Sequence, residues 1–379
     1  MNENEILGFD PTQLDVLNPQ EKPQSAGNPL IYKTSPAKSN FDDGRYRCTI
    51  KVVYNPFDLR KSVLEQQSYG LQDKNGWFNV ISSLTNNDTS CPIFKAWKKC
   101  HFADPKKDEA SKKLWLQAAK KEDGGYELFD KRFARYVVVQ VLEDKNQPEV
   151  VGKFLFWKMP KTVWDIIQSK MAPSVESKKP KIPVMDFLFG RSIDLEVIPG
   201  EGEVGSEKYN RDTKYIAELS EDVVSCTNPD GSPLLNDNEQ EILDNYVSAI
   251  KKVWKEKDPV KRAEIEAEVN ADPNTAALRG VYSRALEQIK SFCPNLIKEL
   301  GYNEWNSEVV TRVQNWITVV LSCNDPATVD VNDLEVIRNG GTPSVQPTQT
   351  TQKTVTATPS VSSVQTNVTQ DENTDDLPF

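Results

Sequence analysis

The stretch of sequence that decides the fold class is FARYVVVQVLEDKNQPEVVGKFLFWK, residues 133–158. Its runs 133–142 and 151–158 are rich in β-branched and aromatic residues, which indicates two strands. Alternation in the second run separates its side chains into two faces, with Lys153, Leu155 and Trp157 on one and Phe154 and Phe156 on the other. We expect the two phenylalanines to lie in the core.

Similar strand-like runs lie on both sides of this stretch, at 77–84 and 192–198. Another run, 45–52, alternates apolar residues with Arg45, Arg47, Thr49 and Lys51, which predicts a strand with one apolar and one basic face. Prolines 92 and 160 stand where short helices can begin. Strands in this number, interrupted by short helices, predict a β-barrel with inserted helices over residues 41–220 rather than a doubly wound sheet.

The regions outside the barrel have different patterns. Residues 236–325 carry apolar residues at helical spacing, which predicts an all-helical module, either separate or packed on the barrel. Residues 1–40 show little periodicity and are expected to form a flexible arm. Residues 340–370 consist mainly of Ser, Thr, Gln, Pro and Val, and we expect them to form a disordered linker.

Composition excludes several classes of protein. Only 37% of the 379 residues are hydrophobic, the mean hydropathy is −0.58, and no apolar run is long enough to span a membrane. The N-terminus has neither the basic nor the apolar region of a secretion signal, so we expect a cytoplasmic protein, in the host cytoplasm if it is viral. The six cysteines lie far apart and are expected to be reduced thiols.

The net charge of −10 is unevenly distributed. Residues 41–200 hold 27 Lys and Arg against 21 Asp and Glu, whereas the rest of the chain holds 19 against 35. A basic middle flanked by acidic ends suits a domain that binds a polyanion, although ordinary fluctuation of charge explains it equally well.

The last nine residues, DENTDDLPF, combine acids with two apolar residues around a stiff proline. Such an end can insert an apolar plug into a pocket of a partner while its acids meet a basic rim. It resembles the acidic tip of bacterial single-stranded-DNA-binding (SSB) proteins. The resemblance implies that the tip recruits replication, recombination and repair enzymes, such as a polymerase, primase, helicase or nuclease. The candidate partner-binding residues are Asp375, Asp376, Leu377, Pro378 and Phe379.

The middle of the chain also resembles a family. The blocks DGRYRCTIKVVYNPFDLRKS, NGWFNVISSLTNNDTSCPI and ARYVVVQVLEDKNQPEVVGKFLFWKMPKTVWDII are similar in order and spacing to the helix-destabilising SSB proteins of T-even bacteriophages. The resemblance covers about residues 44–215. It implies an OB-type barrel with a cleft for single-stranded DNA. It also implies cleft cations at Lys51, Lys131 and Arg132 and cleft aromatics at Trp157 and Tyr209.

Single strands are bound by cations that meet phosphates and by aromatic rings that stack on bases. Several aromatic residues here lie close in sequence to cations, although each ring taken singly also fits a half-buried core position. Together with the resemblance, this pattern predicts the following DNA contacts: Arg47, Lys51, Trp77, Lys131, Arg132, Arg135, Tyr136, Lys153, Trp157, Lys158, Tyr209, Lys214 and Tyr215.

The family's structural zinc site is not matched. By the same block alignment, its histidine falls on Tyr69 and its first cysteine on or next to Ser82, and only Cys91 of its Cys-Pro-x-Cys turn is present. Cys100 and His101 add too few ligands at the wrong spacing for a tetrahedral site. We expect no zinc and no other cofactor.

Enzymatic function is not indicated, because the chain has no phosphate-binding G-x-x-x-x-G-K-[ST] loop and no spaced acidic trio suited to a two-metal nuclease. The sequence favours an SSB protein that coats single-stranded DNA during viral genome replication, recombination and repair. Two alternatives stay open, a replisome adaptor with weak or no binding to DNA and an RNA-binding OB protein. Nothing in the sequence separates DNA from RNA.

Overall fold

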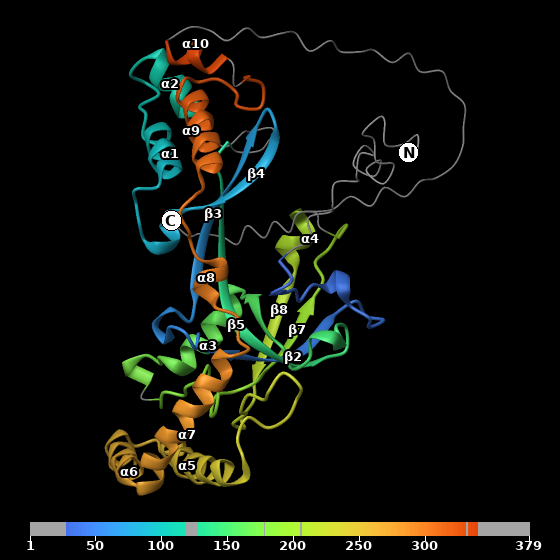
Figure 1. Cartoon of the computed structure of the whole chain (residues 1–379), viewed down its shortest axis with the longest axis vertical. Helices are drawn as coiled ribbons and strands as arrows, with labels where there is room; N and C mark the ends of the chain where they lie inside the picture. Colours follow the sequence, from blue (N-terminus) through green and yellow to red (C-terminus); the bar gives the residue numbers. More distant parts are fainter. Residues whose placement is uncertain (1–27, 119–127, 178, 205–206, 331–332, 340–379) are drawn as a thin grey trace, which may run out of the picture.

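The computed structural model describes residues 28–118, 128–177, 179–204, 207–330 and 333–339. Within them, eight strands form one mixed sheet (Figure 1). The strands are β1 (Ile31–Tyr32), β2 (Tyr46–Val53), β3 (Leu64–Asp73), β4 (Gly76–Ile81), β5 (Asp130–Asp144), β6 (Phe154–Lys158), β7 (Ile193–Ile198) and β8 (Lys214–Leu219). The helices are α1 (Pro92–His101), α2 (Glu109–Leu116), α3 (Lys161–Met171), α4 (Glu207–Asp212), α5 (Asp237–Lys255), α6 (Pro259–Ala271), α7 (Pro273–Lys290), α8 (Leu296–Leu300), α9 (Ser307–Leu321) and α10 (Leu334–Arg338).

The sheet runs in the order β1-β6-β5-β2-β7-β8, and β3 joins it through β5. The β1–β6 pair is parallel and the other pairs are antiparallel. β1 and β8 stand at the two ends of this path, so the strand pairing of the described residues does not close the sheet into a barrel. The described residues therefore show a mixed sheet with helices on it, and the closed barrel stays a prediction.

The long strand β5 organises the molecule because it pairs with different strands along one edge. Its residues 138–144 pair with β2, and its residues 130–136 pair with β3. The β3–β4 hairpin consequently extends away from the main sheet as an arm (Figure 1). Its turn contains Asn75-Gly76, and Gly76 has φ +106°, a conformation that favours glycine in hairpin turns.

One face of the main sheet carries the first core cluster. Alternate residues of β2, β5, β6 and β7 pack there against α3, whose Val163 and Ile167 are fully buried. The segment before β2 also joins this cluster, because Tyr32 of β1 is 2% exposed. Residues 30–34 thus pack on the folded core, and the expected flexible arm 1–40 is too long at this end. Residues 1–27 lie outside the described part of the chain.

The opposite face of the main sheet is covered by helices. Val53, Val138, Phe154 and Phe156 share a second cluster with residues of α5, α7 and α8. The expected helical module 236–325 is divided in the structure, since α9 packs instead in a third cluster with the hairpin and α1. No helix within the described ranges is long and apolar enough to cross a bilayer.

Candidate nucleic-acid interface

The predicted contact residues fall into four groups. Lys51, Trp157 and Tyr209 are buried, with 0%, 1% and 6% of their surface exposed. Tyr136, Lys158 and Tyr215 are half-buried. The exposed members are Trp77, Lys131, Lys153 and Lys214, and the remaining three are the arginines Arg47, Arg132 and Arg135, each of which pairs with a carboxylate. The tip residues 375–379 lie outside the described residues.

Trp157 does not face a cleft, which corrects the expectation for this residue. β1 pairs with β6 directly beside it, and the indole Nε1 donates a hydrogen bond of 3.0 Å to Thr34 Oγ1. Both faces of β6 are buried, because helices cover the side with Phe154 and Phe156 while the first core cluster contains Trp157. Alternation correctly separates the two faces but does not reveal that each of them is covered.

Lys51 is also buried, so its predicted contact with phosphate is wrong for this conformation. It lies near Asp186 and Cys226, and its Nζ has no hydrogen-bond partner among the described residues. Burial lowers the pKa of Lys51, and the nearby Asp186 and Cys226 partly oppose that shift. Burial also raises the pKa of Asp186, whose carboxylate accepts hydrogen bonds from two backbone N–H groups and from Tyr282.

The strand face around Arg47 is not basic in the folded chain. Arg47 pairs with Asp43 and with Glu196 of the neighbouring strand β7. The hollow over this face has a volume of about 420 Å³, and its charged lining residues are Arg47, Lys145, Glu143, Asp194, Glu196 and Glu218. Carboxylates outnumber cations there, so this face does not suit a phosphate backbone.

The hairpin arm offers a better surface. Residues directly opposite each other in antiparallel strands share a face. The pairs Gln72–Trp77, Gly70–Asn79, Gly70–Asp130 and Ser68–Arg132 therefore place these side chains on one face, which we call the hairpin face. Trp77 is 37% exposed on it, and Asn79 is exposed beside it.

Arg132 lies flat across the hairpin face. Its guanidinium forms an ion pair of 2.5 Å with Asp130 and donates a hydrogen bond of 3.1 Å to Asn79 Oδ1. A Cβ on Gly70 would stand 2.6 Å from Asp130 Oδ2 and 2.8 Å from Arg132 Nη2. The absence of a side chain at Gly70 thus leaves room for this ion pair on the sheet surface. Lys131, the next residue along β5, points to the other face of the strand.

The hairpin is supported from behind by α9. Arg312 makes two hydrogen bonds to Asp73, of 2.6 and 2.8 Å, and its guanidinium lies 3.9 Å from the centre of the Phe78 ring. Trp316 Nε1 donates to the backbone oxygen of Gln72. These contacts fix the strands that carry Trp77 and Asn79, so the hairpin face is organised before any ligand binds.

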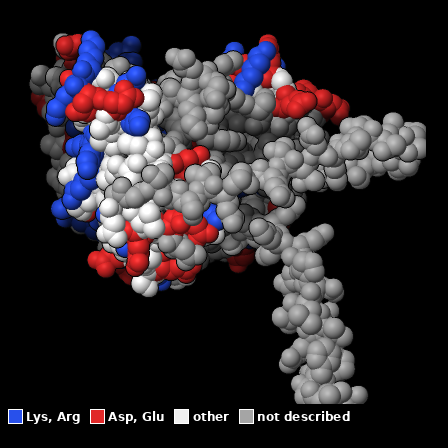
Figure 2. Space-filling model, turned by 90° about the horizontal axis from the view of Figure 1, so that it is seen from above, with Lys and Arg blue, Asp and Glu red and all other residues white. Residues whose placement is uncertain are grey.

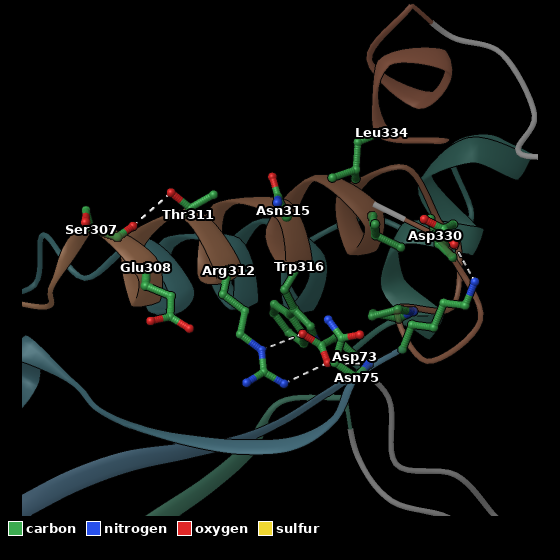
Figure 3. Close-up of a pocket in the computed structure, with 14 residues that line it drawn as sticks. Asp73, Asn75, Ser307, Glu308, Thr311, Arg312, Asn315, Trp316, Asp330 and Leu334 are labelled. Carbon is green, nitrogen blue, oxygen red and sulfur yellow. Dashed lines mark hydrogen bonds and ion pairs between the residues drawn. The ribbon is translucent and has the colours of Figure 1, made fainter. Parts of the chain in front are cut away.

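A cavity of about 440 Å³ lies between α9, the hairpin turn and the segment around Asp330 (Figure 3). Its two cations are already paired, Arg312 with Asp73 and Lys74 with Asp330 at 2.6 Å. Glu308 adds a further carboxylate to the lining. This cavity consequently suits an anionic ligand poorly, and it serves here as part of the hairpin's support.

Helix α8 crosses the hairpin face at the end nearest the main sheet. Gln66 on β3 donates a hydrogen bond of 2.7 Å to the backbone oxygen of Leu300 at the end of α8. Tyr136 and Lys158 lie on the same face as Arg132, directly opposite each other, but beyond this crossing. Tyr136 is half-buried in the second core cluster, and burial raises its pKa. Within the described part of the chain, the face is therefore left uncovered by helices from Ser68 to the hairpin turn.

Lys153 and Lys214 do not join this surface. Lys153 lies just before β6, and Lys214 begins β8 at the edge of the sheet. Sequence reasoning missed Gln72 and Asn79. The available signal was Asn75-Gly76, which indicates a hairpin. In the structure Asp73 pairs with Gly76, so the two loop residues are Lys74 and Asn75.

The positions of the family's zinc ligands are occupied by packed side chains. Tyr69 and Cys91 belong to the third core cluster, and Phe94 packs against it. Cys100 is buried in that cluster, whereas His101 is exposed and stacks on Trp97. No group of three or more potential metal ligands occurs within the described ranges.

No protein-family model matches the chain, and no curated protein matches it.

Proposed function

We propose that this chain is a non-catalytic SSB protein with an OB-type core. It binds transient single-stranded DNA during viral genome replication, recombination and repair. The observation that carries the proposal is the hairpin face, where exposed Trp77 lies with Gln72, Asn79 and Arg132 on a rigid sheet surface. An aromatic ring that stacks on any base, beside a cation and amide groups, suits binding with little sequence preference.

The resemblance of residues 44–215 to the T-even phage SSB family supports the same function. So does the tip DENTDDLPF, which resembles that of bacterial SSB proteins. In this proposal the core holds the strand and the tip recruits the enzymes that act on it. No metal takes part, because the positions of the family's zinc ligands carry Tyr69 and Ser82.

Intrinsic tryptophan fluorescence tests the core function. Titration with poly(dT), poly(U) and a duplex should show quenching by single strands, and Trp77→Ala should weaken the binding of poly(dT) by about 1–3 kcal/mol because one stacking contact is lost. Phe57→Ala is the matched control, since Phe57 is an aromatic residue of similar exposure, 41%, outside the hairpin face. Wild-type protein that binds none of the three nucleic acids would favour the adaptor function. A preference for poly(U) would favour the RNA-binding one.

The tip has its own test. Removal of Phe379 leaves every acidic side chain in place, so binding to poly(dT) should not change while capture of replication or repair enzymes should fail. Partner capture that survives this deletion would contradict the role of the tip without affecting the proposed role of the hairpin face.

A further inference from the structure

Helix α1 carries three different stripes of side chains. Ile93, Ala96 and Cys100 are buried against the hairpin and α9. The outer stripe consists of Lys95, Lys98, Lys99 and Phe102, at positions i, i+3, i+4 and i+7, which share one side of a helix. All four of these residues are exposed.

Between these stripes lies a ladder of aromatic rings. Phe94 and Trp97 are stacked with centroids 5.8 Å apart and planes inclined by 9°, and Trp97 and His101 are stacked at 4.6 Å and 14°. Phe102 meets Trp97 and His101 edge-on and is 73% exposed. The ammonium of Lys98 lies 4.5 Å from the centre of the Phe94 ring, so cations and rings are in direct contact.

The surface continues onto α2 and the loop before it. Over residues 91–118 the chain has seven lysines, all exposed, against three acids, and the lysines are Lys95, Lys98, Lys99, Lys106, Lys107, Lys112 and Lys113. Within the described residues these lysines form a single ion pair, between Lys112 and Glu109 at 3.9 Å. The carboxylates of Asp104 and Asp108 accept backbone N–H groups instead. Figure 2, which looks down on this end of the molecule, shows blue side chains gathered along one side.

This surface is distinct from the hairpin face. α1 and α9 pack on the side of the hairpin that carries Tyr69, Leu71 and Val80, whereas Trp77 and Arg132 lie on the other side. Of the eight predicted DNA-binding cations, Lys51 is buried and Arg47, Arg132 and Arg135 are paired with acids. The lysines of α1, α2 and the loop between them are all exposed, and among the described residues only Lys112 has an acidic partner.

We propose that the exposed side of α1 and α2 is a second binding subsite for single-stranded nucleic acid. Its lysines contact phosphates, and Phe102 with the ring ladder stacks on bases. This inference rests on the proposed function. An acidic peptide would use the lysines alone, whereas parallel rings beside exposed cations fit a ligand that carries both phosphates and flat bases.

The test compares three full-length proteins in salt titrations with dT oligonucleotides long enough to reach both subsites. The first is wild type, the second is Lys95→Gln/Lys98→Gln/Lys99→Gln, and the third is the control Lys252→Gln/Lys255→Gln/Lys261→Gln on α5 and α6, whose lysines are also exposed. Loss of three phosphate contacts should lower affinity at least tenfold at low salt and reduce the log–log salt slope by about 2, from about 0.7 per phosphate. The control should behave as wild type.

Phe102→Ala provides a second, independent variant. Because the ring carries no charge, this substitution should lower affinity about fivefold or more while leaving the salt slope unchanged, as expected for lost stacking. Circular dichroism and thermal melting should match wild type for all variants, since the substituted side chains are exposed.

The outcomes separate this inference from its premise. If Trp77→Ala weakens binding but the α1 triple variant and Phe102→Ala do not, the second subsite is wrong and the proposed function stands. If wild type binds no single strand, both fail. The lysines could instead bind the chain's own acidic tip. In that case the triple variant should bind DNA more tightly than wild type. The increase should be absent when the tip also carries Asp371→Asn/Glu372→Gln/Asp375→Asn/Asp376→Asn. This result would overturn the proposed subsite.

Discussion

Trp157 and Trp77 have similar sequence surroundings and opposite environments in the structure. Each lies in a strand with lysines nearby, and both were predicted to stack on bases. Trp157 is 1% exposed at the centre of the sheet, where β1 runs beside its strand and Thr34 accepts the indole hydrogen bond. Trp77 is 37% exposed near the end of the hairpin arm.

The difference between them lies in what covers the strand. β6 is covered by α3 and other core elements on one face and by helices α5, α7 and α8 on the other. Among the described residues, α1 and α9 cover one face of the hairpin, and α8 crosses the other face near Leu64 and Gln66. An aromatic residue beside a lysine therefore indicates a binding surface only where one face of the strand is left open.

The largest expected effect tests the buried side of this comparison. Trp157→Ala should lower the free energy of unfolding by about 3–5 kcal/mol, because it leaves a large cavity in a packed core and removes the hydrogen bond to Thr34. Denaturant titration measures this loss, with Phe57→Ala as a control that should change stability little. If Trp157→Ala has normal stability but binds DNA more weakly, Trp157 lies in a DNA-binding cleft, as the resemblance implies.

The next effect concerns Lys51, whose side chain is fully buried near Asp186 and Cys226. Burial lowers its pKa in the folded chain, so the unfolded chain binds more protons than the folded chain as the pH rises toward 10.5, the ordinary pKa of lysine. The free energy of unfolding therefore increases with pH over this range. In Lys51→Met this rise is absent. The melting temperature of wild type minus that of Lys51→Met should therefore increase between pH 7 and pH 9.5.

Lys252→Met is the control for this measurement, since Lys252 is exposed and should not change the pH dependence. A difference between wild type and Lys51→Met that stays constant over the same pH range would show that Lys51 is not held in a low-dielectric site.

The smallest effect sharpens the open side of the comparison. Asp130 pairs with Arg132 on the hairpin face and competes with phosphate for the same guanidinium. Asp130→Asn should tighten the binding of poly(dT) a few-fold at low salt, and the gain should shrink as salt rises. Asp43→Asn, which removes a carboxylate from the Arg47 ion pairs, is the control and should leave binding unchanged. Equal tightening by both substitutions would indicate a general effect of net charge.

Strands β2, β4, β5, β6 and β7 were predictable, because alternation in runs such as 45–52 and 151–158 is a local property of the chain. Strands β1, β3 and β8 were not predicted. The covering of the strand faces was not predictable, since it depends on contacts between residues far apart in sequence. Thr34 reaches Trp157 across 123 positions, and Tyr282 reaches Asp186 across 96. The same applies to charge. Arg47 belongs to a basic stripe in sequence, and only the pairing of β2 with β7 reveals its carboxylate partner Glu196.

Because α9 supports the hairpin, the hairpin and α9 pack together late in the synthesis and folding of the chain. Trp316 and Gln72, which hydrogen-bond each other, are separated by 244 positions, and Arg312 and Asp73 by 239. Contacts of such high sequence separation form late, because a long loop must close before they stabilise anything. During synthesis, a nascent chain that already exposes β3 and β4 outside the ribosome still lacks α9. The hairpin therefore acquires its final support only when most of the described chain has been made.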